Sequence, residues 1–106
     1  MSRILVIDDE LSMREVLEMY FMAEGHEVLT AADGLEGQEV MDREVVDLVI
    51  TDLRMPRAGG LEVLAHARAH HPHLPVIMMT AFASTETALE AMKTGAYDYF
   101  TKPFKL

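Results

Sequence analysis

Short apolar segments alternate with helix-like segments along the whole chain, and this alternation limits the folds that the sequence can adopt. The apolar segments lie at residues 4–7, 28–29, 45–50, 76–79 and 97–100. Three of them are apolar at almost every position, which is typical of strands buried on both faces, as in parallel sheets. Strands that are joined by helical crossovers run parallel, and the crossovers are right-handed.

The segments between these predicted strands carry start and stop signals for helices. The first helix is predicted to begin at the capping box Ser12-Met13-Arg14-Glu15 and to end at Gly25. Val16, Tyr20 and Ala23 recur at helical spacing within it. Three more helices are predicted over residues 35–43, 61–70 and 85–94. Their start and stop signals are Asp33-Gly34, Gly59-Gly60, Pro72, Ser84 and Gly95.

Five strands and four helices in strict alternation predict a doubly wound α/β sandwich with a five-stranded parallel sheet. Such a sheet needs helices over both faces, and four helices cover one face fully and the other only in part. The chain ends at Leu106, directly after the last predicted strand. We therefore expect that a fifth helix is missing from the chain because it is removed, disordered or replaced by a partner.

The composition narrows the class of protein. The 106 residues correspond to one domain, and the lack of cysteine excludes disulfides, thiolate metal sites and cysteine nucleophiles. No apolar segment approaches the roughly 20 residues that a membrane span requires. The N-terminus also lacks the layout of a signal peptide. We therefore expect a cytoplasmic protein with no membrane contact.

The charge is distributed unevenly. The net charge is −9, and residues 1–50 hold thirteen acidic and three basic side chains. Direct nucleic-acid binding requires a basic footprint, which this chain lacks, and an anionic membrane surface is disfavoured for the same reason. The acidic half suits a basic partner or a metal cation better. The alternative explanation is that the acidic groups only keep the surface soluble.

Polar side chains follow four of the predicted strands, where α/β sheets bind their ligands. They are Asp8, Asp9 and Glu10, then Thr51 and Asp52, then Thr80, and finally Thr101 and Lys102. Crowded carboxylates repel one another, and a hard divalent cation such as Mg²⁺ with oxygen ligands removes that conflict. Asp52 is the best candidate nucleophile because it follows the central run, and its attack on a phosphoryl group would give an aspartyl phosphate.

Lys102 can supply a positive charge to one phosphoryl oxygen, and Thr80 can donate a hydrogen bond to another. Any one of these aspartates could instead be a simple turn or cap residue, because aspartate is common in both. Their joint placement at neighbouring strand ends favours a shared site for an anion and a metal.

Several motifs together resemble the receiver domain of two-component response regulators, the CheY-like family. They are residues 4–10 (Ile-Leu-Val-Ile-Asp-Asp-Glu), 31–34, 47–56, 79–81 and 95–104. The resemblance covers essentially the whole chain. It implies a flavodoxin-like fold with strand order 2-1-3-4-5 and a single receiver domain over residues 1–106, truncated before its last helix.

The resemblance assigns roles by position. Asp52 is expected to be the phosphoacceptor, and Asp8 and Asp9 the acidic pair that holds Mg²⁺, with Asp9 as the direct ligand. Asp52 itself and the backbone carbonyl of Arg54 are expected to be further metal ligands. These assignments make the chain a signalling switch with slow self-dephosphorylation, and not a turnover enzyme.

The same resemblance assigns the switching residues. Thr80 is expected to move onto the phosphoryl group, Tyr99 to rotate inward as it does so, and Lys102 to contact the phosphoryl group. In the stretch 57–60, Arg-Ala-Gly-Gly departs from the family pattern, so we expect Gly59 to cap its helix less well and the loop to be more mobile.

The partners also follow from the resemblance. A sensor histidine kinase is the expected phosphoryl donor. Residues 52–56, 80–82 and 96–100 are similar to receivers of the nitrogen-regulation group of sigma54-dependent activators, which precede an ATPase domain and a DNA-binding domain. Transcription is then the expected output, and a homodimer is one arrangement that the family allows.

Two other functions use a similar fold. A phosphatase of the haloacid-dehalogenase kind would need an acid two residues after Asp52, where this chain has Arg54. A flavin-binding module would place a phosphate near Asp8-Asp9-Glu10, which would repel it. His66 and His70 have metal-ligand spacing on a predicted helix, and we interpret them as solvated surface groups.

Overall fold

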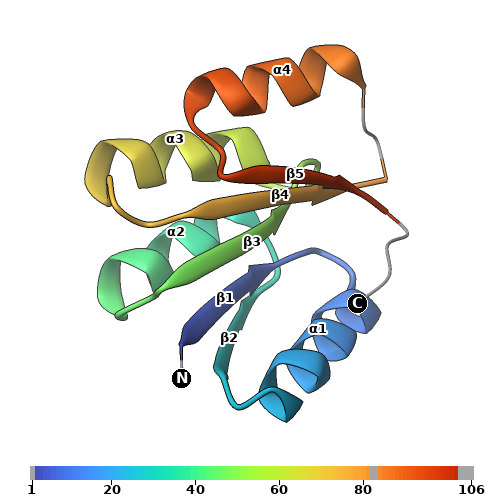
Figure 1. The fold of residues 1–106 in the computed structure, drawn as a ribbon, viewed down its shortest axis with the longest axis vertical. Helices are drawn as coiled ribbons and strands as arrows, with labels where there is room; N and C mark the ends of the chain where they lie inside the picture. The colour runs from blue at the N-terminus through green and yellow to red at the C-terminus, as the bar shows by residue number, and fades with distance from the viewer. Residues whose placement is uncertain (1, 82–83, 103–106) are drawn as a thin grey trace.

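The computed structural model describes residues 2–81 and 84–102, which form a five-stranded parallel sheet with helices on both faces (Figure 1). The elements in chain order are β1 (Arg3–Ile7), α1 (Leu11–Ala23), β2 (Glu27–Ala31), α2 (Gly34–Arg43), β3 (Leu48–Asp52), α3 (Gly60–His70), β4 (Val76–Thr80), α4 (Thr85–Thr94) and β5 (Asp98–Thr101). The strand order is β2-β1-β3-β4-β5, which confirms the predicted fold class. These residues contain four helices and no fifth.

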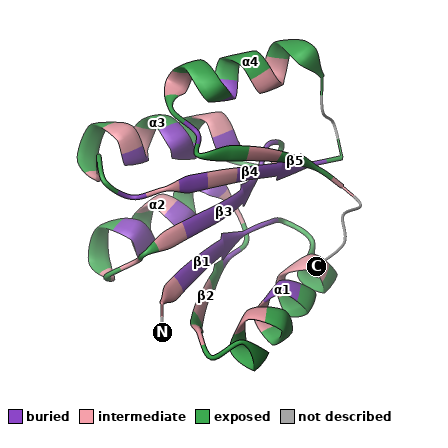
Figure 2. Cartoon of the chain, viewed as in Figure 1, coloured by how far each residue is buried: buried purple, intermediate pink, exposed green. Residues whose placement is uncertain are grey.

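The helices divide unequally between the two faces of the sheet. α1 lies alone on one face, and α2, α3 and α4 lie on the other (Figure 1). Alternate residues of β1 point to opposite faces, so Leu5 and Ile7 join the core under α2 and α3, and Ile4 and Val6 join the core under α1. The central strands β1, β3 and β4 between these layers are largely buried, and the edge strands β2 and β5 are more exposed (Figure 2).

The start of α1 differs from the prediction. The helix begins at Leu11, and its N-cap Glu10 makes no side-chain cap hydrogen bond, so Ser12 lies inside the first turn and is not the cap. The reason is local: the Asp8 carboxylate accepts the backbone N–H of Glu10 at 2.9 Å, which turns the chain into the helix before Ser12 is reached. The predicted end is correct, because Gly25 has φ +90° just after the helix.

The buried face of α1 also differs from the prediction. Val16 and Tyr20 are 51% and 36% exposed, and Ala23 is exposed as well. Leu17 is buried instead, and Met13 and Phe21 pack beside it at i, i+4 spacing.

Two strand boundaries also shift relative to the sequence pattern. β3 starts at Leu48, and Val45 is 75% exposed in the loop before it. The Asp47 carboxylate in this loop accepts the backbone N–H of Arg3 at 2.8 Å, and the pairing of β1 with β3 begins only at Ile4 and Leu48. β5 runs one residue later than expected, from Asp98, and leaves Tyr97 exposed.

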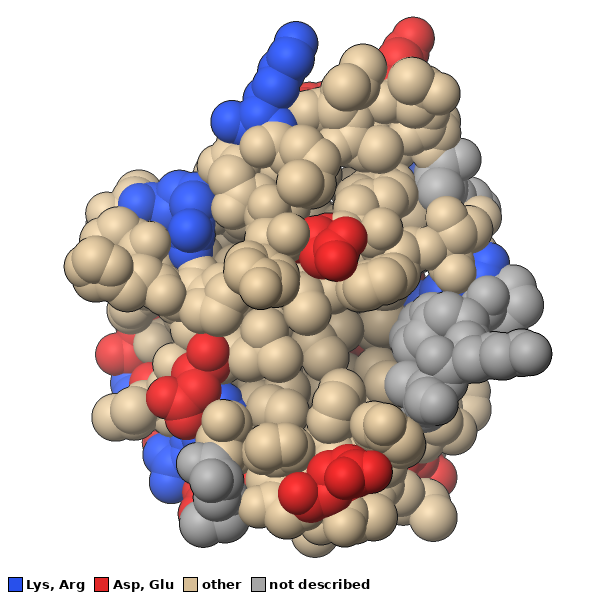
Figure 3. Space-filling model, in the orientation of Figure 1, with Lys and Arg blue, Asp and Glu red and all other residues tan. Residues whose placement is uncertain are grey.

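The remaining helix termini follow the predicted signals. Asp33 caps α2 by accepting the backbone N–H of Glu36, and Ser84 caps α4 through a capping box with Thr87. Gly95 ends α4 in the left-handed conformation. On the face seen in Figure 3, basic side chains of the described residues lie apart from one another and form no continuous patch. Within residues 2–81 and 84–102, no helix is both long enough and apolar enough to cross a membrane.

Candidate functional site

The parallel register brings the ends of the central strands to one edge of the sheet. Ile7 at the end of β1 pairs with Thr51 of β3, and Asp52 at the end of β3 pairs with Met79 of β4. Thr80, the last residue of β4, pairs with Thr101. The residues predicted from strand ends therefore meet at this carboxyl edge, as expected for a parallel sheet.

Lys102 links the acidic side chains at this edge. Its Nζ donates to Asp8 Oδ2 at 2.7 Å and to Asp52 Oδ2 at 3.2 Å, and it lies 3.6 Å from Glu10 Oε1. The Lys102 side chain is only 8% exposed, and Asp8 and Asp52 are buried. A backbone hydrogen bond from Lys102 N to Thr80 O, at 2.8 Å, holds the lysine at the end of β4.

Burial and neighbouring charges set the protonation behaviour of this group. Burial raises the pKa of Asp52, the charge of Asp8 raises it further, and the Lys102 ammonium acts in the opposite direction. Burial by itself would lower the pKa of Lys102, but its hydrogen bond to Asp8 and the charges of Asp8 and Asp52 outweigh burial and raise that pKa. The structure thus keeps one ammonium among carboxylates that repel one another.

Asp8, Glu10 and Asp52 form what we call the carboxylate cluster. One oxygen from each of the three lies within 4.8 Å of the others. All the donors are oxygen atoms, the two aspartates are buried, and Glu10 is largely exposed, so the cluster can open a side to water. This donor set suits a hard divalent cation such as Mg²⁺, which uses one or two carboxylates and keeps several waters.

The other predicted site residues lie around this cluster. Asp9 is exposed, and the cluster that the structure brings together contains Glu10 in its place. Arg54 lies two residues beyond Asp52 in the loop between β3 and α3, with an exposed side chain. Thr80 is fully buried at the end of β4. Sequence reasoning placed Glu10 at the strand end but gave it no role, because its exposure and direction depend on the turn that precedes α1.

Tyr99 is half-buried on β5 and packs against the core on the side of α4. Its hydroxyl lies 2.9 Å from Thr87 Oγ1, and Thr87 also completes the capping box of α4 with Ser84. The predicted switch residue is therefore connected to the first turn of α4. No sequence signal pointed to Thr87, since the capping-box partner at this position is usually Glu or Gln.

Two glycines allow α3 to begin directly against β3. A Cβ on Gly60 would lie 2.3 Å from the carbonyl oxygen of Asp52 and 2.6 Å from the Met78 sulfur, and a Cβ on Gly59 would lie 2.6 Å from the Leu53 carbonyl oxygen. The N–H of Gly60 donates to that Leu53 oxygen at 2.8 Å. Gly59 is therefore needed for close approach, which explains the absence of a side-chain cap on α3.

Arg57 ties the loop after β3 to the N-terminus of α2. It adopts φ +69°, an unusual value for a residue with a side chain, and its guanidinium donates to both oxygens of Asp33, at 2.9 and 3.2 Å. The backbone N–H of Gly34 also donates to the Ala58 carbonyl oxygen at 3.0 Å. These contacts tether the loop for which the sequence predicts greater mobility.

The carboxyl edge thus holds a buried carboxylate at the end of the central strand, beside a second aspartate and a lysine from two other strand ends. The model of the response regulator receiver domain matches residues 4–106. The chain belongs to the response regulator receiver domain family.

Curated relatives of this receiver domain are transcriptional regulators. It is 38% identical over 105 residues to the response regulator protein PilR of Pseudomonas aeruginosa, a match that covers 99% of the chain and 24% of PilR. It is 41% identical over 105 residues to the regulatory protein AtoC of Escherichia coli, covering 99% of the chain and 23% of AtoC. The chain therefore spans about a quarter of the length of these relatives.

Solved structures agree with this assignment. The response regulator TrrA of Thermotoga maritima, in complex with Mg²⁺ and beryllofluoride, matches with a TM-score of 0.89 at 36% identity, covering 99% of this chain and 90% of TrrA. The receiver domain of NtrX from Brucella abortus matches with a TM-score of 0.89 at 38% identity, covering 96% of this chain and 87% of that domain.

Proposed function

We propose that this receiver domain is a phosphoacceptor switch in which Asp52 takes a phosphoryl group from the phosphohistidine of a sensor histidine kinase. The P–N bond of the donor breaks as an oxygen of Asp52 bonds to phosphorus. The observation that supports this best is the position of Asp52, buried at the end of the central strand and within hydrogen-bond distance of Lys102. Membership of the receiver family and the Mg²⁺ and beryllofluoride bound by TrrA support the same chemistry.

The residues around Asp52 would have separate roles in metal binding, charge pairing and orientation of the carboxylate. Asp8, Asp52 and either Asp9 or Glu10 would hold Mg²⁺ with the backbone carbonyl of Arg54, and the bound cation would neutralise phosphoryl oxygens. Lys102 Nζ lies 3.2 Å from Asp52 Oδ2, close enough to form an ion pair with a phosphoryl group on Asp52. Asp52 Oδ1 accepts the backbone N–H of Leu53 at 2.7 Å, which fixes the orientation of the carboxylate.

We propose that the conformational change caused by phosphorylation is transmitted from Thr80 through Tyr99 to α4. A phosphoryl group on Asp52 would draw the Thr80 hydroxyl towards it, and the Tyr99 ring would follow into the space released. Because the Tyr99 hydroxyl already contacts Thr87, this movement would change the first turn of α4. The surface of α4 and β5 is then the region whose affinity for partners changes.

The proposed partners follow from the relatives. A sensor histidine kinase would be the donor, and ATPase and DNA-binding domains in the complete cytoplasmic protein would be the outputs, so that transcription is controlled. Homodimerisation of the receiver would be one way to transmit the change. We propose no turnover of a separate substrate, because Arg54 stands where a phosphatase of similar fold would need an acid.

Intact-mass measurement after incubation with acetyl phosphate and Mg²⁺ tests this function. We expect one phosphoryl group on the wild-type chain, none on Asp52→Asn, and none when the divalent cation is removed by chelation. Asp42→Asn is the matched control, because Asp42 is an aspartate on α2 outside the carboxylate cluster, and it should accept the group normally. An adduct that persists in Asp52→Asn, or no adduct on a folded wild-type chain with Mg²⁺, contradicts the proposal.

A further inference from the structure

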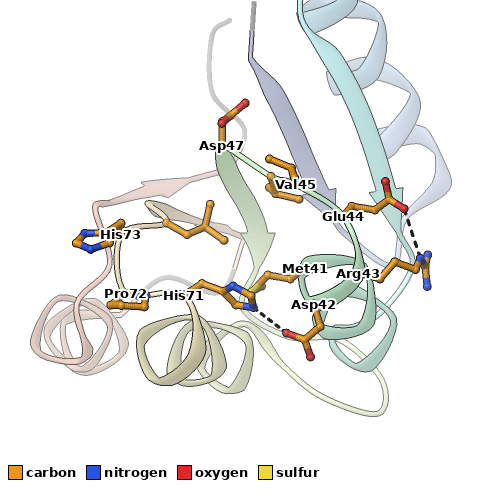
Figure 4. A pocket seen from close by; sticks show the side chains of 11 residues that line it. Met41, Asp42, Arg43, Glu44, Val45, Asp47, His71, Pro72 and His73 are labelled. Atoms are coloured by element: carbon orange, nitrogen blue, oxygen red, sulfur yellow. Dashed lines mark hydrogen bonds and ion pairs between the residues drawn. The ribbon is translucent and has the colours of Figure 1, made fainter.

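A second group of metal-ligating side chains lies where α2 and α3 end. Asp42 is near the end of α2, His66 is on α3, and His71 is the C-cap residue of α3. We call these three residues the histidine cluster. The Nε2 atoms of His66 and His71 lie 2.8 and 2.7 Å from the same Asp42 oxygen, Oδ1. Figure 4 shows the His71 ring directed at Asp42, beside an open pocket between the loops that follow the two helices.

His66 is not the simple solvated surface group expected from the sequence, and neither is His71. The side chains of His66 and His71 are 19% and 29% exposed, and they converge on a residue of another helix. The partner of His66 at i+4, His70, contacts it only through its ring, with 4.5 Å between the centroids. His70 is exposed, as expected from the sequence, and the other two members of the group are His71 and Asp42 of α2.

The charges at this position favour a cation. The half-exposed carboxylate of Asp42 supplies the negative charge at this point, and both imidazole Nε2 atoms lie against the same carboxylate oxygen. Asp42 is in the last turn of α2 and His71 ends α3, so the negative ends of two helix dipoles meet here.

The distances fit a metal of the zinc type after a small adjustment. Tetrahedral Zn²⁺ with nitrogen and oxygen ligands at about 2.0–2.2 Å places its ligand atoms roughly 3.3 Å apart. The nitrogen atoms lie 2.7 and 2.8 Å from the carboxylate oxygen, and all three atoms lie within 4.8 Å of one another. Outward movement of the two rings by about half an ångström would open the site. The Asp42 side chain is 50% exposed, so water can reach a fourth position.

We propose that Asp42, His66 and His71 form a binding site for a borderline divalent cation such as Zn²⁺, which joins α2 to α3. Two imidazole nitrogens and one carboxylate suit zinc, nickel or copper and disfavour Mg²⁺. The site is separate from the carboxylate cluster, because it lies where the helices end, before β3 and β4 begin. The proposal does not depend on phosphorylation of Asp52.

Calorimetric titration with Zn²⁺ tests the site, using the Asp8→Asn/Asp52→Asn double variant so that the carboxylate cluster does not compete. We expect one equivalent bound. His66→Gln and His71→Gln should each weaken binding at least about 10-fold, and His73→Gln, an exposed histidine outside the cluster, should leave it unchanged. Co²⁺ in place of Zn²⁺ should give the visible absorption of a tetrahedral site.

NMR of the histidine rings supplies a readout that does not rely on variants. Zn²⁺ added to the same double variant should shift the Nε2 resonances of His66 and His71 and leave those of His73 in place. Binding that survives both glutamine variants, shifts confined to His70 or His73, or no binding below millimolar Zn²⁺ would overturn the proposal. In the last case the cluster is only a hydrogen-bonded link between the two helices.

Discussion

Carboxylate and nitrogen groups meet at two places in the molecule, the carboxyl edge of the sheet and the ends of α2 and α3, but they do so under different conditions. At the carboxyl edge, Asp8 and Asp52 are buried and share the ammonium of Lys102. At the ends of α2 and α3, Asp42 is half exposed and accepts from two imidazoles. Burial raises the pKa of Asp52, and the hydrogen bonds of His66 and His71 lower that of Asp42.

The difference shows that the type of nitrogen group determines which kind of metal ion the carboxylates can bind. An ammonium group has no free electron pair, so only oxygen atoms at the carboxyl edge can bind a metal, and a hard cation fits. An imidazole can exchange its proton for a metal, so the histidine cluster suits a borderline cation. The two places also differ in burial. Removing one member of a buried ion pair lowers the free energy of unfolding far more than removing one member of an exposed pair.

The largest effect is expected from Lys102→Met. This change leaves Asp8 and Asp52 buried without their cation, and we expect the free energy of unfolding in urea, without divalent cations, to fall by about 3 kcal/mol. Mg²⁺ should restore part of the loss. Lys93→Met, at an exposed lysine of α4, is the control and should change stability by less than about 0.5 kcal/mol. Equal losses of stability in Lys102→Met and Lys93→Met would contradict the expected effect of burial.

Gly60→Ala tests how tightly the carboxyl edge is packed. Its Cβ would lie 2.3 Å from the Asp52 carbonyl oxygen, so we expect a loss of about 2 kcal/mol and slower phosphorylation of Asp52 by acetyl phosphate. Gly25→Ala is the comparison, because its φ is +90° but no atom lies within 4 Å of its Cβ. It should cost about 1 kcal/mol and leave the rate unchanged. A normal rate in Gly60→Ala would contradict the close contact.

Thr87→Val tests the connection between Tyr99 and α4. It removes the capping box with Ser84 and the hydrogen bond to the Tyr99 hydroxyl, so we expect a loss of about 1 kcal/mol and a shift of the Tyr99 ring resonances. Thr94→Val, at the other end of the same helix, loses only a bond to the Glu90 carbonyl and should leave the Tyr99 ring unaffected. Unchanged Tyr99 resonances in Thr87→Val would argue against the proposed path.

The smallest effect is expected from Asp33→Asn, which tests an exposed ion pair at the carboxyl edge. The hydrogen bond from Arg57, and then that from the Glu36 N–H, lower the pKa of Asp33 below its ordinary value of 3.8. Since the folded pKa is lowered, this stabilisation is present above about pH 4 and is lost as the pH falls through the folded pKa. Asparagine can still cap α2. The stability difference between wild type and variant should therefore be small at pH 7 and should shrink as the pH falls below about 4, and a constant difference would exclude a role for the charge.

The order of the elements and most of the carboxyl edge could be predicted from the sequence alone. Apolar runs buried on both faces are visible without coordinates, and the residues that follow them, such as Asp8, Asp52 and Lys102, must meet because parallel strands end together. The caps at Asp33, Ser84 and Gly95 were also readable, because capping depends on a few neighbouring residues. The strand order came from the family resemblance and not from the pattern.

The buried face of α1 and the side-chain contacts between different elements depend on tertiary packing. α1 has apolar residues around most of its surface, so its periodicity allowed more than one face, and packing on the sheet selected that of Leu17. The histidine cluster joins residues 24 and 29 positions apart, and Arg57 reaches Asp33 over 24 positions. Such contacts depend on how α2 and α3 pack together and on the rotamers that this packing allows. Neither can be predicted from the neighbouring residues in the sequence.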